Sequence, residues 1–255
     1  RIKIENEEGY ILKISRVDEN KKYLEYQQHL LQFIENSDEE LIAPKAVTDK
    51  NKHLISEITD RHKNTRCVRL LTWVSGNLWS AVNPQLEDLR FSIGEQCGTL
   101  TKALQGFKHP EAHYNFEWDI AQSLWTKKHL HLFEATEKEL LMQYQNKFEA
   151  CQPSYTALRK SIVHNDPNDN NIIVTQNRLQ PKAKAAIDYG DAIHTQIIND
   201  AAILCAYGIM GHNDPLDAAL AFIKGYHFSF PLLEKEVAHL YNAIAMRLVI
   251  IVTRA

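Results

Sequence analysis

The chain has 255 residues, of which 44% are hydrophobic and 24% are charged, which is the composition of a globular domain with a substantial core. Its formal net charge of −3 indicates no basic surface for nucleic acid or anionic membranes. The four cysteines show no Cys-x-x-Cys spacing and indicate reduced thiols in a cytoplasmic protein. The longest apolar run, residues 248–252, is too short to cross a bilayer. We therefore expect neither a nucleic-acid partner nor a membrane.

The first third of the chain predicts a small lobe of strands with one helix. Residues 1–5 and 10–15 flank a polar turn and predict a β-hairpin. Apolar residues recur at spacings of three and four over 21–35, which predicts a helix. Two further strands are predicted over 53–58 and 67–73. Because the chain opens inside a strand and ends inside an apolar segment, we expect it to be a piece of a longer protein, with possible fusion to further domains.

The remainder predicts a mainly helical lobe. Asn83-Pro84 reads as a helix start, and Thr136-x-x-Glu139 reads as a capping box. Helices are expected over 86–104, 116–133, 136–150, 197–210, 216–226 and 232–252. The chain therefore predicts an α+β fold of two lobes, with residues 1–72 forming the N-terminal lobe and 73–255 the hinge and C-terminal lobe.

A polar loop lies between two β-branched runs, residues 162–163 and 172–174, which we expect to form a hairpin within the helical lobe. The loop contains His164, Asp166 and Asn171 in the spacing His-x-Asp-x4-Asn. A third apolar strand ends in Asp188-Tyr189-Gly190. Hard oxygen ligands at two strand ends suit Mg²⁺, so Asn171 and Asp188 are candidate metal ligands. A loop rich in Asn and Asp can also be a solvated turn, but this spacing and context favour a functional site.

The same spacing occurs in protein kinases, where the loop Asp is the catalytic base and the Asp-x-Gly aspartate binds metal. Asp166 is therefore the candidate base, and we expect His164 to brace the loop through backbone hydrogen bonds. Lys13 matches the lysine that binds nucleotide phosphates, although a strand lysine is more often a surface residue. Glu25, on the predicted helix, is the best-placed acid to pair with it.

Two further features have kinase counterparts. The segment before Gly76 matches a hinge whose backbone binds the nucleotide base, which makes Leu71, Trp73 and Val74 candidate nucleotide-binding residues. Asp200 opens an apolar helix and is a candidate anchor for the catalytic-loop backbone. The alternative for Asp200 is an acid favoured by the helix dipole. A phosphate-binding glycine-rich loop is not visible, and would lie at or before Arg1 or be poor in glycine.

The loop motif and the segment Ile187-Asp188-Tyr189-Gly190-Asp191 resemble the aminoglycoside phosphotransferase and choline-kinase-like superfamily, within it most of all the hydroxylysine kinases and their bacterial relatives. Asn165 and Tyr189 stand where this family commonly has Gly and Phe. The resemblance implies a two-lobed protein-kinase-like fold and a kinase that uses Mg²⁺ with ATP or GTP. Its acceptor would be the hydroxyl of an amino alcohol or hydroxylated amino acid. The alternative is a pseudokinase-like nucleotide-binding module, or one domain of a larger multidomain enzyme.

Overall fold

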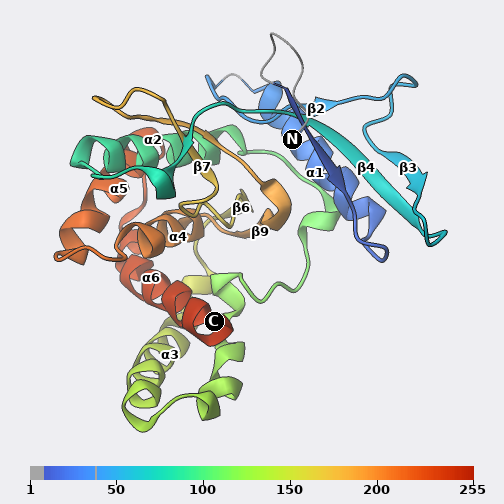
Figure 1. The fold of residues 1–255 in the computed structure, drawn as a ribbon. Helices are drawn as coiled ribbons and strands as arrows, with labels where there is room; N and C mark the ends of the chain where they lie inside the picture. The colour runs from blue at the N-terminus through green and yellow to red at the C-terminus, as the bar shows by residue number, and fades with distance from the viewer. Residues whose placement is uncertain (1–8, 38) are drawn as a thin grey trace.

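A computed structural model of the chain describes residues 9–37 and 39–255 (Figure 1). A small N-terminal sheet with one helix adjoins a larger, mainly helical part, which confirms the predicted α+β class. The strands are β1 (Tyr10–Ile14), β2 (Ala46–Val47), β3 (Ser56–Thr59), β4 (Thr65–Thr72), β5 (Asn77–Leu78), β6 (Lys160–Val163), β7 (Ile172–Val174), β8 (Ala183–Ala186) and β9 (Ile193–Gln196). The helices are α1 (Lys21–Glu35), α2 (Glu87–Ala103), α3 (Ala135–Thr156), α4 (Ile198–Gly208), α5 (Pro215–Ser229) and α6 (Glu234–Arg254), with short 3₁₀ helices η1 (Trp79–Ala81), η2 (Pro110–Ala112), η3 (Ile120–Leu132) and η4 (Tyr189–Asp191).

The N-terminal sheet is built around β4, which pairs antiparallel with β1, β2 and β3. The register with β1 places Lys13 opposite Arg69. Helix α1 begins after Asn20, whose side chain accepts a hydrogen bond from the backbone of Lys22, and its apolar side is buried. The predicted strand over residues 1–5 and any phosphate-binding loop there lie outside the described residues.

The strands on either side of the catalytic loop do not form the predicted hairpin. Strand β6 pairs with β9, and β7 pairs with β8 and β5. The hairpin prediction was wrong: the eight residues between the two strands are too many for a tight hairpin turn, and they hydrogen-bond among themselves, as from the Asn168 N–H to the Asp166 carbonyl and from the Asn171 N–H to the Asn168 carbonyl. Pairing of β7 with β8 still brings the ends of both strands to one place, since Ile172 lies opposite Ala186.

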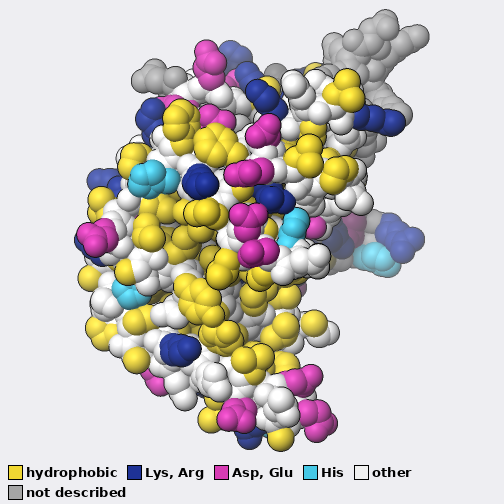
Figure 2. Space-filling view, turned by 90° about the vertical axis from the view of Figure 1, so that its left-hand side faces the viewer, with side chains coloured by type: hydrophobic (Ala, Val, Ile, Leu, Met, Phe, Trp, Pro, Cys, Tyr) yellow, Lys and Arg dark blue, Asp and Glu magenta, His cyan; other side chains and the backbone are white. Residues whose placement is uncertain are grey.

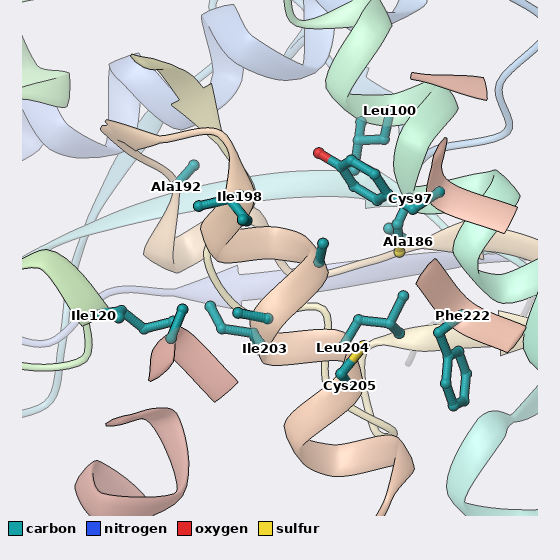
Figure 3. Packing of buried hydrophobic residues seen from close by; sticks show 14 of the residues in the cluster. Cys97, Leu100, Ile120, Ala186, Ala192, Ile198, Ile203, Leu204, Cys205 and Phe222 are labelled. Atoms are coloured by element: carbon teal, nitrogen blue, oxygen red, sulfur yellow. The ribbon is translucent and has the colours of Figure 1, made fainter. Parts of the chain in front are cut away.

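The core of the helical part is centred on α4, which is apolar around its whole circumference after Asn199 and Asp200 in its first turn and is almost entirely buried (Figure 3). Helices α2 and α5 cross next to it at glycines. A Cβ atom on Gly94 would lie 2.0 Å from the backbone oxygen of Phe222, and one on Gly225 would lie 1.9 Å from that of Phe91. The two helices can approach this closely only because both positions lack a side chain.

Three predicted helix starts differ from the structure. Helix α2 begins at Glu87 rather than at Asn83-Pro84. Leu86 is extended, and the residue before it, Gln85, accepts a hydrogen bond of 2.7 Å at its side-chain Oε1 from Trp79 Nε1, outside the helix. Helix α3 has its capping box at Glu134 and Glu137 rather than at 136 and 139, two residues earlier than predicted. The segment predicted as a helix over 116–133 is the 3₁₀ helix η3, capped by Asp119.

Helix α6 is, among the described residues, the one helix long and apolar enough to cross a membrane by length and composition alone, a test that core helices of soluble proteins also pass. It packs against α3 and α4 in this structure.

An apolar groove of about 520 Å³ lies between α3, α5 and α6. Figure 2 views the molecule from the left-hand side of Figure 1, and hydrophobic side chains gather in the lower half of that face.

Candidate active site

The catalytic loop is held by a buried carboxylate. Asp200, at the start of α4, is 1% exposed, and it accepts hydrogen bonds from the backbone N–H groups of His164 at 3.0 Å and Asn165 at 2.7 Å. Burial raises the pKa of Asp200 to about 7, while the two amide donors act in the opposite direction. The predicted role of Asp200 as the anchor of the loop is confirmed by this geometry.

The turn after the anchor explains a departure from the family pattern. Asn165 has φ of 63°, in the left-handed region that glycine adopts most easily and that Asn tolerates better than most residues. Its side chain is fully buried, and its amide has no hydrogen-bond partner among the described residues. The backbone geometry therefore matches a glycine position, and Asn165 occupies it at the cost of an unsatisfied amide.

His164 contacts backbone on both sides of the site. Its Nδ1 accepts a hydrogen bond from the backbone N–H of Asp166 at 3.2 Å, so its Nε2, 3.0 Å from the carbonyl of Ile187, carries the proton. Its ring packs on Tyr189 with centroids 4.7 Å apart. Burial lowers the pKa of His164 to about 4, so the ring is neutral. These are the bracing contacts expected of His164; a catalytic role for it stays a prediction.

Asp166 has both carboxylate oxygens engaged. Oδ1 accepts a hydrogen bond from Arg247 at 2.8 Å, while Oδ2 accepts one from Asn168 and one from Asn171, each at 2.8 Å. Each carboxylate oxygen has two lone pairs, so Oδ1 keeps one for another donor. Burial raises the pKa of Asp166 to about 6, Arg247 lowers it, and Asp191 raises it further. The side chain is thus fixed in place with one acceptor position remaining.

Arg247 is the residue of this site that the sequence analysis missed. It comes from α6, is buried, and also donates to the carbonyl of Trp118 at 2.9 Å. Its guanidinium lies over the rings of Trp118, at 4.9 Å, and Tyr207, at 5.6 Å. One feature of the sequence could have indicated it: Arg247 is a single arginine within an apolar helical run. An arginine that such a helix buries needs a partner of opposite charge.

Asn171 and Asp188 lie at the neighbouring ends of β7 and β8, and the backbone N–H of Ile187 donates to the carbonyl of Asn171 at 2.8 Å. Because Asn171 donates through Nδ2 to Asp166, its Oδ1 is free to act as a ligand. Asp188 has φ of 62° and uses Oδ1 to bind Lys13 at 2.8 Å. The two residues thus offer hard oxygen donors that fit Mg²⁺. No group of three metal-binding side chains occurs among the described residues, so waters and phosphates would supply the other ligands.

The predicted pair between Lys13 and Glu25 is wrong, since Lys13 binds Asp188 instead. Helix α1 turns Gln27 towards the sheet, where it accepts a hydrogen bond from Arg69 at 2.5 Å. Glu25 is two positions away, which places it on the other side of the helix, where it lines a separate polar cavity. Lys13 itself lines the cleft beside Asp188, and its binding of nucleotide phosphates stays a prediction.

The three candidate hinge residues differ in their surroundings. Leu71 lies inside β4, between Ile11 and Ala46 of the neighbouring strands, and its side chain is buried. Trp73 follows the end of β4 and donates its backbone N–H to Gly9 at 3.0 Å. The side chain of Val74 packs in a small apolar cluster with residues of β7 and β8. Binding of a nucleotide base by these residues stays a prediction.

Comparison with known proteins places this geometry in a family. A family model described as "Phosphotransferase enzyme family" matches residues 1–235. The hydroxylysine kinase of Xenopus laevis is 27% identical over 259 residues, covering 93% of this chain and 68% of the relative. The hydroxylysine kinase of Mus musculus is 24% identical over 252 residues, covering 93% of this chain and 67% of the relative.

Solved structures show the same fold. A microcompartment-associated aminopropanol kinase superposes with a TM-score of 0.76 at 19% identity, over 97% of this chain and 78% of the other. An amicoumacin kinase in complex with AMP-PNP and Ca²⁺ superposes with a TM-score of 0.74 at 16% identity, over 98% of this chain and 75% of the other. These likenesses confirm the predicted two-lobed kinase fold.

Proposed function

Because this chain belongs to the phosphotransferase enzyme family, we propose that it transfers the γ-phosphoryl group of ATP or GTP to a hydroxyl group, with Mg²⁺ as the metal. The acceptor that we propose is an amino alcohol or a hydroxylated amino acid. The observation that carries this proposal is the grouping of Asp166, Asn171, Asp188 and Lys13 through direct contacts: Asn171 donates to Asp166, Lys13 pairs with Asp188, and the backbone joins Asn171 to the residue before Asp188. A pseudokinase-like module is not favoured, since all four groups are present.

The proposed chemistry is one displacement. The acceptor hydroxyl attacks the γ-phosphorus, a new P–O bond forms, and the bond to the β-phosphate oxygen breaks. Asp166 orients the hydroxyl and takes its proton at Oδ1, the oxygen that keeps a lone pair. An ionised carboxylate is sufficient, because the hydroxyl loses its proton late. Arg247, Asn168 and Asn171 hold the carboxylate in the orientation that this transfer needs.

Charge on the nucleotide requires cations. Asn171 and Asp188 would hold Mg²⁺, which when bound neutralises charge on the phosphate oxygens. Lys13 would bind the phosphates, which requires it to exchange or share the contact with Asp188. The side chains of Lys13 and Asp188 are 32% and 54% exposed, so breaking their ion pair costs little free energy.

The named relatives support the acceptor class. The matched curated proteins are hydroxylysine kinases, and one structural neighbour is an aminopropanol kinase. Each compound in these names carries both a hydroxyl group and an amine. The cytoplasmic location and the lobe boundary between residues 72 and 73 stay predictions.

The experiment is a coupled assay of nucleoside diphosphate release from ATP and GTP with hydroxylysine and aminopropanol as acceptors. We expect acceptor-dependent turnover that Asp166→Ala abolishes and Lys13→Ala reduces through kcat/KM for the nucleotide. Binding of a fluorescent ATP analogue should survive Asp166→Ala. Nucleotide binding without phosphorylation of any acceptor hydroxyl would favour the pseudokinase alternative.

A further inference from the structure

Helix α1 is bonded to the candidate metal site by a tyrosine. Among the described residues no side chain of α1 pairs with Lys13, which binds Asp188 instead. Tyr23 lies in the first turn of α1, and its hydroxyl donates a hydrogen bond to the backbone carbonyl of Gly190. Gly190 is in η4, two residues after Asp188. The helix of the N-terminal part therefore contacts directly the segment that carries a candidate metal ligand.

A second tyrosine, Tyr114, supports this contact from the helical part. Its hydroxyl lies 2.6 Å from that of Tyr23 and 3.2 Å from the carbonyl oxygen of Ala192, and the two rings meet edge to face with centroids 5.2 Å apart. A hydroxyl has one proton, and Tyr23 donates its proton to Gly190, so Tyr114 is the donor between the two hydroxyls. Burial raises the pKa of both tyrosines, so both keep their protons at neutral pH.

The contact bears on Asp188 because the backbone of that residue is strained. Asp188 has φ of 62°, in the left-handed region, and such a residue keeps this conformation only where the surrounding contacts fix the chain. Before it, the carbonyl of Ile187 lies 3.0 Å from His164 Nε2. After it, the carbonyl of Gly190 accepts the hydrogen bond from Tyr23. Tyr23 thus holds the chain on one of the two sides of Asp188.

We propose that Tyr23 is a positioning residue for the metal: its bond to Gly190 keeps the Asp188 carboxylate in the orientation that binds Mg²⁺. This inference rests on the proposed function and deepens it, because it gives α1 a part in binding the metal. Tyr23 makes the link from α1 to the site that Glu25 was expected to make. Among the described residues the hydrogen-bond partners of Asp166 lie in the helical part, so loss of the Tyr23 contact should leave Asp166 in place.

The test is Tyr23→Phe, which removes one hydroxyl and keeps the ring. Binding of a fluorescent ATP analogue is measured with increasing Mg²⁺ and with EDTA. We expect the Mg²⁺ concentration for half-maximal tightening to rise about 3- to 30-fold, the range for a hydrogen bond lost with its acceptor left unpaired, and the metal-free affinity to stay unchanged. In turnover assays the KM for Mg²⁺ should rise by the same factor, with the KM for the acceptor unchanged. The midpoint of urea unfolding should stay close to that of the wild-type protein.

Tyr144→Phe is the matched control, since the Tyr144 hydroxyl lies 3.4 Å from that of Tyr241, between α3 and α6 and away from the cleft. It should keep the wild-type dependence on Mg²⁺. Tyr114→Phe should have a smaller effect than Tyr23→Phe, and combining the two should add little, because Tyr114 acts through Tyr23.

An unchanged Mg²⁺ dependence in Tyr23→Phe would overturn the inference. A lower urea midpoint together with equal losses of nucleotide affinity with and without Mg²⁺ would also overturn it, because that pattern indicates a structural role alone. Nucleotide binding by the wild-type protein that is independent of Mg²⁺ would have the same consequence. If the wild-type protein binds nucleotide with Mg²⁺ but phosphorylates no acceptor, the proposed function is overturned, and the binding measurements still decide on Tyr23.

Discussion

Replacing Arg247 by methionine removes the cation bound to Asp166 and keeps an apolar side chain against Trp118. Loss of one partner of a buried ion pair costs about 3–5 kcal/mol when the other charge stays ionised. Asp166 is 18% exposed and keeps its bonds to Asn168 and Asn171. With a pKa already near 6, it can also be neutralised at pH 7 for less than about 1.4 kcal/mol. We therefore expect Arg247→Met to lower the free energy of unfolding by about 2–3 kcal/mol.

Urea unfolding followed by tryptophan fluorescence measures this loss, and a double-mutant cycle with Asp166→Asn isolates the ion pair. Arg254→Met is the control: Arg254 is on the same helix, lies over the ring of Trp125 and pairs with Glu117, but both charged side chains are exposed. It should cost less than about 1 kcal/mol. A coupling energy between positions 166 and 247 below about 0.5 kcal/mol would refute the reasoning.

Three other changes have defined outcomes. Asp188→Asn should abolish turnover with little change in melting temperature, and an active variant would remove Asp188 from the metal site. Because the base must be ionised and burial raises the pKa of Asp166 to about 6, kcat/KM for the acceptor should fall as pH drops through about 6 or, with a metal bound, somewhat lower; His164→Gln should retain that limb. Gly225→Ala should cost about 1–3 kcal/mol in urea unfolding, since its Cβ would lie 1.9 Å from the Phe91 carbonyl oxygen, and unchanged stability would contradict the close helix crossing.

Elements with a local cause were predictable from the sequence. Helix α1 was predicted with the bounds that it has, because the apolar periodicity that indicates it lies within the helix itself. Helix starts were less predictable. Asn83-Pro84 has the residue types of a cap, but Trp79 donates a hydrogen bond to the side chain of Gln85, six positions later, and Gln85 and Leu86 lie outside the helix. Several positions in a sequence can have residue types that suit a helix start, and the contacts of the folded chain decide at which of them the helix begins.

The same division applies to the site. The loop residues His164, Asp166 and Asn171 lie within eight positions, so their spacing alone indicated their grouping. The pairing of Lys13 was mistaken because it depends on which side of α1 faces the sheet. Arg247 was missed because it lies 81 positions after Asp166, on a helix whose packing direction the sequence does not specify.

The distance in sequence between Asp166 and Arg247 also has a consequence for biosynthesis. During translation, every residue of the kinase motifs leaves the ribosome well before α6 does. Until α6 packs, the Asp166 carboxylate has only amide donors, and Trp118 and Tyr207 lack the guanidinium that lies between them. The catalytic loop therefore reaches its final charge balance only when α6 has been made, so a nascent chain can contain the complete motif before it has a finished active site.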